Sequence, residues 1–426
     1  MDFNILKDPI SYIDLFTTDY IIIGQTIIDI LLNEPLTTIN TLTKSSLDNF
    51  LSVLISKNIK FYKDKYDNII FYHNDLKYRI YFTNDSYENF LSNQITTINS
   101  LAVNRHLELI DLYDGVSDIN KKIIRLIDNT IIYKDNKLMI KLIRYSAEYG
   151  FRLHESLFKI INDHSPNILL VNNHIIKDEI IKICMSDHPE YIKDLETYGL
   201  LKYIIPELHL CFYTEQENPW HIYNVGDHTI EVLKNTPKDF DIRIAALFHD
   251  IGKCFCKRVD SDGIAHFHGH SKISKEKANT IFDRLFFSQK EVKLILKLIE
   301  LHDYKIGPKA KSVRKFISSY NISDDFFDKL MKLQYADMMG KNLELIKPQI
   351  EILENIKTLY NTIKMEKITQ KELNITGKDL IDNGFDRRKV KVLLEMLLTH
   401  IINNPEDNNR ETLFKIAGNL EKKIRI

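Results

Sequence analysis

Short apolar runs bounded by Asn, Asp and Gly dominate the first part of the chain. Such runs between turn residues are typical of β-strands, so we expect strands over residues 20–23, 60–62, 69–72 and 78–82. A helical pattern over residues 26–32 follows the first strand. This alternation predicts a small α/β or α+β head of roughly one hundred residues.

From residue 128 onward, the apolar positions repeat with the period of a helix. Leu138, Leu142 and Tyr145, for example, are spaced along one helical face. The predicted fold class is therefore α+β, with a mixed head and a mostly helical remainder that includes a linker near residues 366–373. We expect helices over residues 136–148, 177–184, 228–233, 242–248, 272–285, 289–301, 324–339 and 349–365.

The composition is that of an ordinary globular protein. Hydrophobic residues make up 44% of the 426 residues and charged residues 27%, which excludes a wholly disordered or collagen-like chain. The formal net charge is -1, so any binding of phosphate must be local. No apolar run approaches the roughly 18 residues of a membrane span, and the chain does not start with a signal-peptide pattern.

The cysteines indicate a reducing environment. Four cysteines, Cys184, Cys211, Cys254 and Cys256, are too few for a disulfide framework in a chain of this length. They also lack the paired spacing of a zinc site. We therefore predict a cytoplasmic protein and interpret Cys254 and Cys256 as small buried hydrophobic residues.

Histidines gather in one stretch, since eight of the 15 lie between residues 209 and 302. His249 and Asp250 are adjacent at the end of an apolar helix. Adjacent helical residues differ by about 100° around the axis, so both reach one metal ion only near the helix end. Other helices must supply the remaining ligands, and His228 and Asp337 are the candidates.

Two imidazoles and two carboxylates suit Mn, Fe, Co, Ni or Zn, or Mg when few nitrogens bind. A metal-bound water can have its pKa lowered from ~15.7 to ~7, which yields a nucleophile for a phosphorus centre. The pattern thus indicates hydrolysis of a phosphate ester. The alternative is a hydrogen-bonded core pair, and His302–Asp303 is a second His–Asp pair in this chain. His270 and His302 border predicted helices and can point into the same cleft; surface positions are the alternative.

The order His228, His249–Asp250, Asp337 resembles the H…HD…D pattern of the HD phosphohydrolase superfamily. The resemblance implies that these four residues bind a divalent metal ion and that Asp250 is also catalytic. It further places Lys253 near a substrate phosphate, where a solvated helix cap is the alternative. For His270 and His302 it implies contacts with a second metal ion or with phosphate.

Other segments resemble bacterial CCA-adding tRNA nucleotidyltransferases and poly(A) polymerases, in the branch with an HD domain. They are residues 24–32, 97–102, 109–111, 115–118, 144–151, 266–271 and 375–380. The resemblance covers nearly the whole chain and implies four parts. These are a nucleotidyltransferase-like head (1–126), a helical RNA-binding-like neck (127–205), an HD domain (206–345) and a helical tail (346–426).

The head departs from this family where nucleotidyl transfer takes place. Transfer requires two carboxylates at alternate positions of a strand, which hold metal ions against a triphosphate. This chain has the uncharged Thr38 and Asn40 there. Ile28 stands in the place of an arginine, and Leu138 and Ile175 replace polar residues that read the incoming base. We therefore expect a head that keeps its fold and has lost its reaction.

Three functions remain open on these grounds. The favoured one is a metal-dependent phosphohydrolase that acts on nucleotides, 2′,3′-cyclic phosphates or RNA ends. The first alternative is a non-catalytic tRNA-binding protein, for which a basic run over residues 305–315 supplies local charge. The second is an active CCA-adding enzyme, although Glu34 is the only acid between residues 33 and 46. Membrane and DNA partners are not expected.

Overall fold

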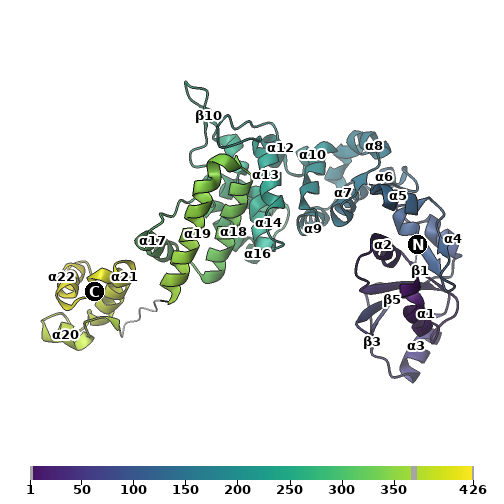
Figure 1. Ribbon diagram of the computed structural model, residues 1–426, viewed down its shortest axis with the longest axis horizontal. Helices are drawn as coiled ribbons and strands as arrows, with labels where there is room; N and C mark the ends of the chain where they lie inside the picture. Colours follow the sequence, from purple (N-terminus) through teal and green to yellow (C-terminus); the bar gives the residue numbers. More distant parts are fainter. Residues whose placement is uncertain (1–2, 366–371, 425–426) are drawn as a thin grey trace. The chain divides into compact units, whose positions relative to one another are not determined.

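The computed structural model describes residues 3–365 and 372–424. The chain divides into two compact units, residues 1–204 and 205–426. The first contains a β-sheet with helices, and the second is mainly helical (Figure 1). The predicted α+β class is confirmed. Most of the linker expected near residues 366–373 lies outside the described residues.

A seven-stranded sheet forms the centre of the head, with the strand order β3-β4-β5-β2-β1-β6-β7. Strands β2 and β5 run parallel, and the other neighbouring pairs are antiparallel. The strands are β1 (Tyr20–Ile23), β2 (Thr38–Thr43), β3 (Phe61–Lys63), β4 (Ile69–His73), β5 (Leu76–Phe82), β6 (Ala102–Asn104) and β7 (Leu109–Ile110).

The helices of the head connect these strands. Helix α2 begins after Gly24, whose backbone has a φ of 58°, a left-handed value that favours glycine. It packs against β2 at the polar end of that strand, where Thr38 and Asn40 lie. The helices are α1 (Lys7–Ile13), α2 (Gln25–Leu32), α3 (Leu47–Ser56), α4 (Tyr87–Ser92) and α5 (Gly115–Lys121).

The rest of the first unit is helical. Arg144 on α7 (Leu138–Tyr149) donates to Glu179 on α9 (Asn173–Cys184), and this buried ion pair ties the two helices together. The other helices are α6 (Ile131–Lys134), α8 (Ser156–His164), α10 (Asp194–Thr197) and α11 (Leu201–Ile204).

Helix α14 lies at the centre of the second unit. Its residues 242–248 are all buried, and it contacts α13, α16 and α18. Because all of these residues are buried, surrounding helices must cover it. The helices of this region are α12 (Pro206–Cys211), α13 (Val225–Lys234), α14 (Phe240–Phe248), α15 (His270–Arg284), α16 (Gln289–Leu301), α17 (Ala310–Tyr320), α18 (Asp324–Met339) and α19 (Leu343–Met365).

A smaller apolar cluster holds the C-terminal helices together. It includes Leu380, Leu393, Leu397 and Leu413, all fully buried. The helices are α20 (Gly377–Asp382), α21 (Val390–Asn403) and α22 (Arg410–Glu421). Across the described residues, no helix combines the length and the apolar character needed to cross a lipid bilayer.

Asp194, the first residue of α10, makes the stability of the first unit depend on pH. Burial raises the pKa of its carboxyl to about 6, although Lys193 opposes the shift. A raised pKa means that the folded chain binds this proton more tightly than the unfolded chain does. The charged carboxyl therefore destabilises the fold above about pH 6, and this cost disappears as the pH falls toward about 4.

We expect Asp194→Asn to increase the free energy of unfolding at pH 8 by on the order of 1–2 kcal/mol. At pH 4.5 the increase should be small, because the wild-type carboxyl is then mostly neutral. Urea unfolding followed by circular dichroism measures both values. Asp178→Asn, at an exposed position of α9, is the control. An equal gain at both pH values would contradict the assignment.

Candidate metal centre

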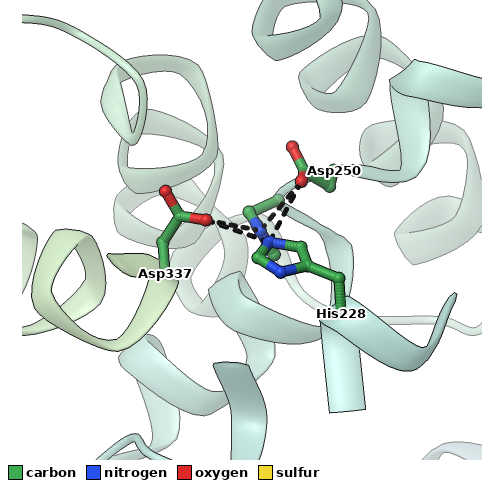
Figure 2. A group of neighbouring side chains, drawn as sticks. His228, Asp250 and Asp337 are labelled. Carbon is green, nitrogen blue, oxygen red and sulfur yellow. Dashed lines mark hydrogen bonds and ion pairs between the residues drawn. The ribbon is translucent and has the colours of Figure 1, made fainter. Parts of the chain in front are cut away.

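Two groups of metal-ligating side chains share one residue in the second unit. In each group, one ligand atom from every residue lies within 4.8 Å of the others, and all of these residues are buried. Figure 2 shows Asp250 and Asp337 directed at the imidazole of His228 from different elements. The first group is His228, His249, Asp250 and Asp337, and the second is Asp250, His270 and His302.

Each candidate ligand lies at or near a helix end. His228 lies in the first half of α13, whose N-terminus is capped by the side chain of Asn224. His249 is the C-cap of α14, and Asp250 follows it directly. The remaining ligands are His270 at the start of α15, His302 as the C-cap of α16, and Asp337 near the end of α18.

The four imidazoles all present the same ring nitrogen to the centre. In each ring, Nδ1 lies 2.7–3.0 Å from a backbone carbonyl oxygen. A carbonyl oxygen only accepts, so Nδ1 must carry the hydrogen and the neutral ring keeps its Nε2 lone pair for a ligand. The accepting residues are Gly340 for His228, Ala246 for His249, Phe267 for His270 and Ile299 for His302.

The carboxylate of Asp250 connects the two groups. Its Oδ2 lies 3.4 Å from Nε2 of His228 and 3.3 Å from Nε2 of His249. Its Oδ1 lies 3.3 Å from Nε2 of both His270 and His302. Each oxygen therefore faces a different group, which is the arrangement of a carboxylate that bridges two metal ions.

Two atoms at this centre are buried without a hydrogen-bond partner in the described structure, namely His249 Nε2 and Asp250 Oδ1. Burial opposes the charged form of His249, but Asp250 and Asp337 outweigh it and raise the pKa of the imidazole to about 9. Burial likewise opposes the charged form of Asp250, yet His249 and Lys253 lower the pKa of its carboxyl well below the usual range. A bound cation would satisfy both unpaired atoms and would take the place of the proton on His249.

Two lysines balance the carboxylates. Lys253 Nζ lies 2.6 Å from Asp250 Oδ2 and also donates to Gln216. Lys341 Nζ lies 2.6 Å from Asp337 Oδ2. Sequence analysis did not identify Lys341, although its position one helical turn after Asp337 was a usable signal. The role of Lys253 at a substrate phosphate stays a prediction, since the structure pairs it with Asp250.

Gly252 lets α15 approach the centre. A Cβ atom at this position would collide with the carbonyl oxygen of His270 and the backbone nitrogen of Ser274. The backbone N–H of Gly252 donates to the Ser274 hydroxyl over 2.9 Å. A glycine two residues after Asp250 therefore allows His270 to reach the carboxylate.

A cavity of about 820 Å³ opens onto both groups. This volume lies within the range of pockets that hold small ligands. Of the basic run over residues 305–315, Lys305 lines it, and so do His221, His266 and His268. The other predicted site residues in its wall are Asp250, Lys253, His270, His302 and Asp337.

Basic side chains lie beside the polar end of β2 in the head. Thr38 and Asn40 stand opposite Lys77 and Arg79 on β5. The Thr26 hydroxyl accepts from the backbone N–H of Asn40 over 2.8 Å and donates to the carbonyl of Thr38 over 3.0 Å. Paired residues of neighbouring strands share a face. The cationic side chains of Lys77 and Arg79 therefore lie next to the two positions at which the family pattern has acids.

Two segments match known families. Residues 150–211 match the probable RNA and SrmB-binding site of polymerase A, and residues 221–346 match the HD domain. The chain is 24% identical over 236 residues to the CC-adding tRNA nucleotidyltransferase of Thermus thermophilus, which is 52% of this chain and 53% of that protein. It is 24% identical over 325 residues to the multifunctional CCA protein of Mannheimia succiniciproducens, covering 69% and 72%. The chain thus matches about half the length of the Thermus relative.

Solved structures extend the likeness over the whole chain. The CCA-adding enzyme of Bacillus stearothermophilus in complex with CTP has a TM-score of 0.66, with 16% identity and 100% of both chains covered. The CCA-adding enzyme of Thermotoga maritima in complex with tRNA has a TM-score of 0.60, with 17% identity and 99% and 96% covered. At such identities the likeness shows a common fold.

These comparisons correct the function that sequence analysis favoured. The relatives and solved structures are nucleotide-adding enzymes, so the prediction of a phosphohydrolase with an inactive head was wrong, and the comparisons favour the nucleotidyltransferase alternative. The resemblance in the polymerase segment, the HD domain and the fold is confirmed. The chain is therefore similar to tRNA nucleotidyltransferases in sequence and fold, and it carries a segment that matches the HD domain.

Proposed function

We propose that this protein is a nucleotidyltransferase that acts on the 3′ end of tRNA. The observation that carries the proposal is that the likeness to solved structures extends over nearly the whole chain. The whole chain superposes on an enzyme bound to CTP, and 99% of it on one bound to tRNA. The RNA-binding match at residues 150–211 supports the same substrate. The relatives include proteins described as CC-adding and A-adding enzymes, so experiment must determine which nucleotide this protein adds.

The head can support transfer only in a modified form. Neutral oxygens from Thr38 and Asn40 coordinate Mg²⁺ weakly, because they carry no charge. Lys77 and Arg79, on the same face of the sheet, can offset the negative charge of a triphosphate. We therefore infer slow transfer, in which positioning by the fold contributes more than metal ions do.

This inference predicts that carboxylates at positions 38 and 40 speed up nucleotide transfer. The double variant Thr38→Asp/Asn40→Asp places two acids on one face of β2, where they can hold Mg²⁺. We expect incorporation of CTP or ATP into tRNA lacking its CCA end to rise by on the order of tenfold or more. Labelled nucleotide and gel electrophoresis measure the rate, and thermal unfolding verifies the fold.

Thr38→Asn is the matched control, because it adds a side chain of similar shape to aspartate without charge. It should leave the rate near that of the wild type. If neither the wild type nor the double variant extends tRNA while both still bind it, the proposed transfer reaction is excluded.

We also propose that the centre in the second unit holds two divalent ions. His228, His249, Asp250 and Asp337 would hold one, and Asp250, His270 and His302 the other. The two unpaired atoms and the four uniformly oriented imidazoles support this proposal. Its nitrogen-rich ligands favour Mn, Fe, Co, Ni or Zn over Mg. A bound ion would supply Lewis acidity toward a phosphate oxygen.

The two ions can be separated by mutation. Metal-free protein titrated with Mn²⁺ or Ni²⁺ should bind two ions by calorimetry and elemental analysis. His302→Ala should lose one ion and keep the other, whereas Asp250→Asn should weaken both. His268→Ala is the control, because His268 lines the cavity but belongs to neither group. Equal stoichiometry in His302→Ala and the wild type would contradict the second ion.

A further inference from the structure

Two cysteines lie against one another next to the metal centre. The Sγ atoms of Cys211 and Cys254 are 3.1 Å apart, although 43 positions separate the residues in the sequence. Cys211 ends α12, and Cys254 lies in the short 3₁₀ helix η5 (Ile251–Phe255). Both thiols are free. Helix α12 and η5 are in contact, so the pair joins two packed elements.

The pair is not explained by metal binding. The groups of possible metal ligands among the described residues include neither cysteine. Cys211 is buried, whereas Cys254 is partly exposed, so a reagent from solvent reaches Cys254 first. The contact between the thiols lowers the pKa of Cys254 and raises that of Cys211. The thiol with the lowered pKa is thus the accessible member of the pair, which favours reaction there.

We propose that Cys211 and Cys254 are a modification site, at which a small-molecule disulfide such as oxidised glutathione introduces a reversible disulfide bond. The Cys254 thiolate attacks one sulfur of the reagent, which forms a mixed disulfide and releases one reduced thiol. Cys211 then loses its proton and attacks Cys254 Sγ, which breaks the mixed disulfide and releases a second reduced thiol. The two electrons lost by the protein thiols reduce the reagent to two thiols.

Little movement separates the reduced and oxidised geometries. A disulfide bond is about 2.05 Å long, so the sulfur atoms need to approach by about 1 Å. The bond would close a loop that contains His228, His249 and Asp250. It would also fix η5, which carries Lys253, against α12. The cross-link would thus stabilise the segment that supplies most of the first metal group.

Cys256 offers a matched control on the same segment. Its Sγ donates to the carbonyl oxygen of Gly252 over 3.4 Å, and no contact joins it to Cys211 in the described structure. Cys256→Ser should therefore leave the proposed bond unchanged, whereas Cys254→Ser should abolish it. Cys211→Ala should stop the reaction at a mixed disulfide on Cys254.

The test treats the full-length metal-free protein with oxidised glutathione at pH 8, followed by alkylation and mass spectrometry. We expect the wild type to lose two titratable thiols and to yield a peptide that joins Cys211 to Cys254. Dithiothreitol should restore both thiols. A glutathione adduct that persists on Cys254 in the wild type, or a bond that maps to Cys256, would overturn the proposal.

Thermal unfolding gives a second readout. Oxidation should raise the Tm of the wild type by about 5 °C or more, because a cross-link over a loop of this length restricts the unfolded chain. The same treatment should leave the Tm of Cys254→Ser unchanged. An unchanged Tm in the wild type, with the cross-linked peptide absent, would show that the thiols do not react with one another.

Discussion

The second unit depends on one buried carboxylate, that of Asp250. Removing a charged carboxylate from water costs several kcal/mol unless nearby groups compensate. Lys253 compensates through direct contact with the carboxylate of Asp250. The imidazoles of two separate groups face the two oxygens of this carboxylate. The helices that carry these groups must therefore converge at Asp250. Gly252 supports this convergence, because it gives α15 the space to bring His270 alongside.

The two polar sites of the chain differ in the ionisable groups that they contain. The second unit places two carboxylates among imidazoles that could hold a metal ion, whereas β2 and β5 place Lys77 and Arg79 beside uncharged side chains. Both arrangements occur within the fold of the CCA-adding enzymes. The apolar residues that form the sheet, such as Ile21 and Leu42, do not depend on these charges. A fold can therefore persist while the charge of a site changes.

Sequence patterns predicted those features that depend on residues close to one another in the sequence. The strands at residues 69–72 and 78–82 correspond to β4 and β5, because turn residues bound their apolar runs. Strand β2 was missed by periodicity, since its threonines are polar in sequence but Thr41 and Thr43 are buried. The candidate metal ligands were identified because their order along the chain is characteristic. The contact between Cys211 and Cys254 was not predicted, because only the packing of α12 on η5 brings these two residues together.

The error about function has a physical origin. Sequence analysis weighed the lost charges at Thr38 and Asn40 as the loss of the whole reaction. Transfer of a nucleotide also requires that the attacking group and the triphosphate be held in line, and such positioning can supply about 7–11 kcal/mol of a barrier. Positioning comes from the fold, and this fold is similar to that of a CCA-adding enzyme. Losing two charges therefore changes the rate of a reaction more readily than it changes the class of reaction that the fold can perform.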